Sequence, residues 1–214
     1  METNFTNAMA CISDDLARTT AINLAAQLDE RADYEIHKNP ENANIHRTLK
    51  KARTVLATPT AARVLLAAEV DPVFVNAIKR DGARRNVYSF GKMADLVGVL
   101  TREAWEGNAI NNAIVRSLIR LTDKGVAFTF ETAKAACSKT FAYEGEGRRF
   151  LVRHTVAPST APTQASSTME ALVEMGVVNT SGGKNARYWL RNEAPIVEHL
   201  RAVLGLPAPE PVAT

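Results

Sequence analysis

Residues 162–191, PTQASSTMEALVEMGVVNTSGGKNARYWLR, decide how the C-terminal half of this chain folds. Apolar side chains recur there at helical spacing, which predicts a helix over 163–175 that ends at Gly176. The stripe consists of Ala165, Met169, Leu172 and Val173. Residues 177–190 then read as two short strands around the turn 179–185, whose Gly, Asn and Ser residues tolerate positive φ angles. The stretch therefore predicts a helix followed by a β-hairpin.

The sequence on either side of this stretch predicts a small domain over residues 108–205. A helix is expected from about Asn108 to Asp123, a second one over 129–138 with Thr129 as its cap, and a last one over 193–204. Residues 139–160 are an insertion that is either a hairpin-like strand pair, with Phe150, Val152 and Val156 in a strand, or a mobile loop. The tail, residues 206–214, has no core-forming side chains and is expected to be disordered.

The N-terminal half, residues 1–107, predicts a helical domain. Helices are expected over about 13–34, 41–56, 60–69, 72–80 and from 87–90 to about 100. Ser13, followed by two acidic residues, is a good helix cap, and Asp71-Pro72 is a good start signal. The break at Gly107-Asn108 marks the domain boundary, but the connection is not linker-like, so packing of the two halves as one unit is the alternative. The fold class is thus mainly α, with an N-terminal helical domain and a C-terminal domain that carries a small β-hairpin.

Composition excludes several classes of protein. The chain has 214 residues, of which 46% are hydrophobic and 23% charged, which is typical of globular proteins. No apolar run approaches the roughly 18 residues that span a bilayer, and the N-terminus does not resemble a secretory signal. Cys11 and Cys137 are expected to be free thiols, so we expect the cytoplasm of a cell or of an infected host. No membrane partner is expected.

The net charge is only +3, but it is unevenly distributed. Residues 1–107 hold 14 basic and 14 acidic side chains, whereas residues 108–214 hold 12 and 9. A locally basic segment, 37–53, either complements the acidic segment before it or presents a face for phosphate, and we favour the first interpretation.

Catalytic motifs are absent from the sequence. It contains no G-x-S-x-G, no H-E-x-x-H and no Walker loop, and the SGGK at 181–184 lacks the spaced first glycine of a phosphate loop. The four histidines have no cysteine or acidic partner at metal-ligand spacing; they are His37, His46, His154 and His199. We therefore expect no enzyme activity, no metal and no cofactor.

The segment SSTMEALVEMGVV followed by GGKNARYWL resembles the recognition helix and wing of winged-helix DNA-binding proteins. The match covers about 30 residues, and about 85–95 if the helices at 108–123 and 129–138 are the preceding pair. One departure is clear: roughly 22 residues, 139–160, separate helices that a short turn joins in the family. Winged-helix folds also serve protein contacts, so the resemblance does not settle function.

The resemblance implies which residues would face double-stranded DNA. The recognition helix 163–175 would place its first residues in the major groove, the wing 179–188 would contact the backbone, and upstream basic residues would add phosphate contacts. These residues are Thr163, Gln164, Ser166 and Ser167 in the helix, Lys184, Asn185 and Arg187 in the wing, and Arg148, Arg149 and Arg153 upstream.

A basic turn over 79–85 is a second candidate. Lys79, Arg80, Arg84 and Arg85 are either a solvated turn or a second contact with phosphate. If both elements bind, the protein is a two-part DNA clamp.

The leading hypothesis is a non-enzymatic protein that binds double-stranded DNA, with the N-terminal helices as a homodimer interface or as a second basic surface. The alternative is a structural or assembly protein of a virus (such as a phage) or mobile element, in which the C-terminal unit is an adaptor for other proteins. A third hypothesis is an enzyme, such as a nuclease with a degenerate site.

Overall fold

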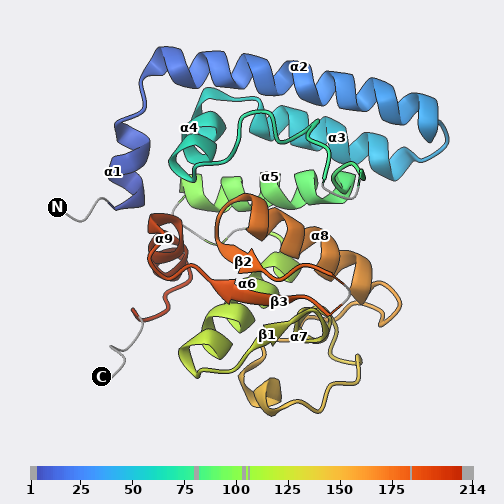
Figure 1. The fold of residues 1–214 in the computed structure, drawn as a ribbon, viewed down its shortest axis with the longest axis vertical. Coiled ribbons are helices and arrows are strands. Elements are labelled where there is room, and N and C mark those ends of the chain that lie inside the picture. The colour runs from blue at the N-terminus through green and yellow to red at the C-terminus, as the bar shows by residue number, and fades with distance from the viewer. Residues whose placement is uncertain (1–3, 80–81, 103–104, 106, 184, 209–214) are drawn as a thin grey trace.

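A computed structural model describes residues 4–79, 82–102, 105, 107–183 and 185–208. Within these residues the chain forms nine α-helices, one short 3-10 helix and a three-stranded antiparallel sheet (Figure 1). The predicted mainly helical class with a small β-hairpin is confirmed.

Five helices make up the N-terminal half. The long helix α2 forms the outer edge of the molecule and α3 returns beside it, while α5 lies next to the C-terminal half (Figure 1). Ser13 caps α2 as predicted, since its Oγ accepts the N–H of Leu16 at 3.2 Å. The five are α1 (Phe5–Ala10), α2 (Asp14–Lys38), α3 (Ala43–Leu56), α4 (Pro59–Ala67) and α5 (Val87–Arg102).

The helix predicted over 72–80 is wrong. The described residues of this segment form turns and one isolated bridge between Ile78 and Arg84. Residues of this segment hydrogen-bond to side chains of α2. Gln27 Nε2 donates to the carbonyl of Pro72 at 2.6 Å, and Asn76 Nδ2 donates to a carboxylate oxygen of Glu30 at 2.7 Å. These tertiary hydrogen bonds replace the local ones that a helix would make.

The C-terminal half contains four helices, the 3-10 helix and the sheet. Its strands run in the order β1-β3-β2, with Phe128 opposite Tyr188 and Val178 opposite Leu190. Strand β1 was not predicted. It leads directly into α7, which Thr129 caps as expected, here with a full capping box. The elements are α6 (Ala109–Asp123), β1 (Phe128–Thr129), α7 (Phe130–Cys137), η1 (Glu146–Phe150), α8 (Ala161–Glu174), β2 (Val178–Thr180), β3 (Arg187–Leu190) and α9 (Pro195–Val203).

The strand predicted within 139–160 is also wrong. The segment contains η1 and a single bridge between Ser138 and Thr155. Its backbone bonds to neighbouring helices: the N–H of Val152 donates to Ser117 Oγ at 2.9 Å, and the N–H of His154 donates to the carbonyl of Ala136 at 2.8 Å. These bonds hold the insertion against α6 and the end of α7.

One continuous hydrophobic core crosses the predicted boundary at 107–108. It includes Phe90, Met93 and Leu100 of α5 together with Met169 and Leu172 of α8. Helix α8 packs between α5 and α7, so its first turn lies where the two halves meet (Figure 1). Of the tail, residues 209–214 lie outside the described part of the chain, whereas Leu206 packs against this core.

Candidate functional site

Helix α8 exposes only a narrow stripe at its start. Thr163 and Ser166 are exposed and Gln164 is half-buried. Ser167 is only 1% exposed, and its hydroxyl donates to the carbonyls of Thr163 and Gln164 at 2.9 and 3.1 Å. Ser167 therefore does not belong to the surface of the predicted recognition helix, because its hydroxyl is turned back onto its own helix.

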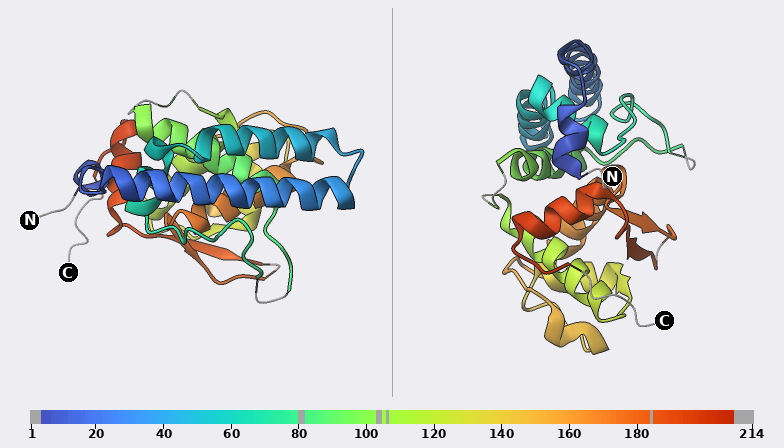
Figure 2. Two further views of the ribbon diagram at one scale, coloured as in Figure 1. Left: turned by 90° about the horizontal axis from the view of Figure 1, so that it is seen from above. Right: turned by 90° about the vertical axis from the view of Figure 1, so that its left-hand side faces the viewer.

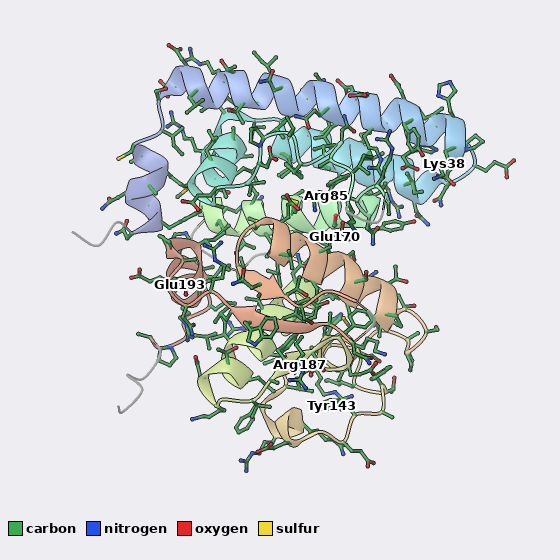
Figure 3. All side chains as sticks on the ribbon, in the orientation of Figure 1. Lys38, Arg85, Tyr143, Glu170, Arg187 and Glu193 are labelled. Carbon is green, nitrogen blue, oxygen red and sulfur yellow. The ribbon has the colours of Figure 1, made fainter. Side chains whose placement is uncertain are left out.

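The second half of the stripe is covered by the predicted basic turn. Lys79 Nζ pairs with Glu170 at 2.9 Å, and the backbone N–H of Asn86 donates to the same carboxylate at 3.0 Å. Arg85 forms an ion pair with Glu174. Burial raises the pKa of Glu174, and the positive charge of Arg85 acts against this shift. Arg85 and Glu170 both lie at the junction between the N-terminal helices and α8 (Figure 3). These pairs neutralise two of the predicted phosphate contacts.

The other two basic residues of this turn are Arg84, which is described, and Arg80, which lies outside the described residues. The guanidinium of Arg84 lies 4.2 Å from the ring centroid of Tyr34, which is a cation–π contact, and no acidic side chain of the described residues forms an ion pair with it. The turn is thus mainly a connection between α2 and α8, with Arg84 as its available cation.

The β2–β3 hairpin is the second exposed element. Asn185 and Arg187 are exposed, and Lys184 lies outside the described residues. Gly182 and Gly183 have φ angles of 69° and 80°, which explains the glycine pair in this turn. The hairpin projects from the same side of the molecule as the segment around Gly82 (Figure 2). Both loops can therefore approach one extended partner.

The three upstream arginines do not join this surface. Arg148 and Arg149 are exposed on η1, which packs against α6, far from α8 in Figure 1. Arg153 serves the fold: its guanidinium donates to the carbonyls of Ala135, Ser138 and Phe141 at 3.0, 2.9 and 2.6 Å. Ala135 lies in the last turn of α7 and Ser138 is its cap residue, so Arg153 binds carbonyls at a helix end that have no partner within the helix, and it ties the loop at Phe141 to that end.

Replacing Arg153 by alanine is expected to lower the free energy of unfolding by about 2 kcal/mol, because three carbonyls lose a charged donor. Urea denaturation measures the change. The matched control is Arg149→Ala on exposed η1, which is expected to stay within about 0.5 kcal/mol of the wild type. Equal stability of the two variants would contradict this structural role for Arg153.

A cavity of about 500 Å³ lies where α3, α5 and the first turn of α8 meet; we call it the junction cavity. Its lining includes Arg47, Lys51, Lys92, Asn108, Thr163 and Gln164. Sequence analysis missed it, although two signals pointed there: the basic segment 37–53, and a lysine, Lys92, that stands between the apolar residues Phe90 and Met93. Only folding brings these residues next to the start of α8.

No protein-family model, no curated protein and no solved structure matches this chain. Among the described residues, no helix is both long and apolar enough to cross a bilayer. The same part of the chain holds no group of three or more His, Cys, Asp or Glu side chains placed to bind a metal ion.

Proposed function

We propose that this protein binds double-stranded DNA without acting as an enzyme. One observation carries the proposal: a helix, a short strand and a second helix precede α8, and a hairpin whose second strand, β3, pairs with that short strand follows it. Two helices, the recognition helix and a hairpin follow one another in the order that the winged-helix resemblance implies, and the short strand is an addition to it. This order supports the hypothesis that the start of α8 and the hairpin contact the DNA.

The geometry favours shallow contacts between α8 and DNA rather than deep insertion of the helix into the major groove. Thr163 and Ser166 are open for base edges or phosphates, but further along α8 Glu170 and Glu174 are engaged by Lys79, Arg85 and Asn86. Arg187 is an exposed cation on the hairpin, and Arg84 is a half-buried cation whose guanidinium lies over the Tyr34 ring. Most of the affinity would then come from the phosphate backbone.

Fluorescence anisotropy with a labelled duplex tests the proposal. Arg187→Ala is expected to weaken binding to all duplexes alike and to reduce the slope of log K against log salt by about 1, because one phosphate contact is lost. Ser166→Ala is expected to alter sequence preference instead.

Arg18→Ala on exposed α2 is the matched control and is expected to bind DNA as the wild type does. No binding of the wild type at about 50 mM salt would overturn the proposal. An Arg187→Ala variant that behaves like Arg18→Ala would overturn the assigned contact surface.

A structural or assembly role is the second candidate, and one observation favours it. Helix α2 exposes three large apolar side chains, Leu16, Ile22 and Ile36. Apolar groups on an outer helix can pack against a second copy or a partner. A defined multimer that forms without nucleic acid, together with absent DNA binding, would favour this candidate over the first.

A further inference from the structure

The junction cavity contains a buried and poorly partnered ammonium group. Lys92 is 6% exposed, and among the described residues only Asn108 Oδ1 hydrogen-bonds its Nζ, at 3.4 Å. That oxygen already accepts the backbone N–H groups of Ile110 and Asn111. A buried ammonium has three donors and is costly to desolvate unless strong acceptors surround it. Lys92 therefore has unused donor capacity at the edge of an open cavity.

The carboxylate nearest in sequence does not satisfy this need. Asp95 stands one turn further along α5, and its Oδ1 pairs with Lys51 Nζ at 2.6 Å. Arg47 stands on the same wall of the cavity, one turn before Lys51, and among the described residues its guanidinium hydrogen-bonds only the neutral side chain of Asn44, at 2.9 Å. Three cations thus face one carboxylate that is already engaged. The cavity has a net positive charge of about two, and it favours an anion.

The opposite wall supplies neutral polar groups. Thr163 and Gln164 come from the first turn of α8, where the helix dipole adds positive potential. Thr160, the cap residue of α8, makes no hydrogen bond to the helix through its side chain. Hydroxyl and amide groups beside lysine and arginine are the donors that phosphate oxygens commonly find in proteins.

Size and depth indicate a small molecule. About 500 Å³ lies within the range of small-molecule sites. The phosphates of a duplex lie on the surface of a wide cylinder, whereas Lys92 is a buried residue that lines the cavity. We propose that the junction cavity binds a small phosphorylated molecule, whose phosphate group lies between Lys92, Lys51 and Arg47. This proposal does not depend on DNA binding.

Isothermal titration calorimetry of the full chain tests this proposal with three probes: inorganic phosphate, ribose 5-phosphate and uncharged ribose. Saturable binding is expected for both phosphates and none for ribose, because the charge is what the cavity recognises. Lys92→Met is expected to weaken phosphate binding at least tenfold. The matched control Lys50→Met, on exposed α3 outside the cavity, is expected to bind as the wild type does.

A second variant guards against misfolding of the first. Lys51 is half-exposed, so Lys51→Met is expected to fold, and it leaves the Asp95 carboxylate free to repel the anion. Its affinity for phosphate is expected to fall as well. No saturable binding of either phosphate to the wild type would overturn the proposal. So would Lys92→Met and Lys50→Met of equal affinity, or a Lys92→Met variant that loses only duplex DNA binding.

The pH dependence of phosphate binding is a further readout of the same experiment. Burial lowers the pKa of Lys92 to about 8, against the opposing charge of Asp95. The positive charge of Lys51 also lowers the pKa of Lys92. Burial raises the pKa of the Cys137 thiol to about 12, so this thiol stays neutral. Only protonated Lys92 attracts an anion, so affinity is expected to fall as the pH rises through about 8. Affinity that is constant from about pH 7 to pH 10 would contradict a phosphate contact by Lys92.

Discussion

Replacement of Phe90 by alanine is expected to lower the free energy of unfolding by about 3–5 kcal/mol. Phe90 is fully buried on α5, and its ring packs edge-on against Phe74 with 5.9 Å between centroids. Truncation removes this aromatic pair and leaves a cavity that α5, held on both sides, cannot collapse. The effect is expected to reach the C-terminal half, because α5 and α8 belong to one core.

The reporter of this effect is Trp189 on β3, in the opposite half of the chain. In a Trp105→Phe background, Trp189 fluorescence and far-UV circular dichroism are expected to give coincident transitions, both shifted by Phe90→Ala. Ile22→Ala on α2, where the side chain is 69% exposed, is the control and is expected to cost much less. A Trp189 transition that Phe90→Ala leaves unmoved would show that the halves unfold separately.

Replacement of Lys92 by methionine is expected to stabilise the protein near neutral pH, by an amount on the order of 2–3 kcal/mol. The pKa of Lys92 falls from 10.5 to about 8, mainly through burial. Below about pH 8 both folded and unfolded chains hold the proton, and the folded chain carries the full desolvation penalty. Methionine has similar length and removes the charge, so the penalty disappears.

The sign of the pH dependence distinguishes this cause from improved packing. Between about pH 8 and 10.5 the unfolded chain binds more protons than the folded one, so the stability of the wild type rises with pH. The advantage of Lys92→Met is therefore expected to shrink over that range. Guanidinium denaturation at several pH values measures it, with Lys50→Met as the control. A constant gap from pH 7 to pH 10, or no gap at all, would contradict the assignment.

The expected effects of Lys92→Met on stability and on phosphate binding together explain why a lysine is buried at this position. A group that destabilises the fold is retained where an interaction compensates for it, as is common at binding sites. If Lys92→Met both raises stability and abolishes phosphate binding, the destabilising charge is explained by the ligand. Stabilisation without any loss of phosphate binding would leave Lys92 as an unexplained buried charge.

Local signals predicted most of the elements correctly. Caps such as Ser13 and Thr129 begin the helices that were expected of them, and Gly176 ends α8. The hairpin over 177–190 was also predicted, because positive φ angles at Gly182 and Gly183 are a local requirement. Such features depend on side chains that contact their own backbone within a few residues, so the sequence shows them directly.

The two wrong elements, 72–80 and the strand within 139–160, share a cause. In both, backbone or side-chain groups bind distant helices, α2 in the first case and α6 in the second. Local propensity favoured a regular element in each segment, and long-range hydrogen bonds outweighed it. Arg153 was misassigned for the same reason, since the carbonyls that it binds belong to another part of the chain.

The sequence by itself determined the helical class, the positions of most helix ends and the helix–hairpin stretch at 162–191, because these depend on neighbours along the chain. Only the tertiary structure decided which charges remain available. Lys79 and Arg85 are neutralised by α8, whereas Lys92 is buried beside Arg47 and Lys51. The physical reason is that charge compensation and burial depend on distances in space, and residues far apart in sequence set those distances when α5 and α8 pack together.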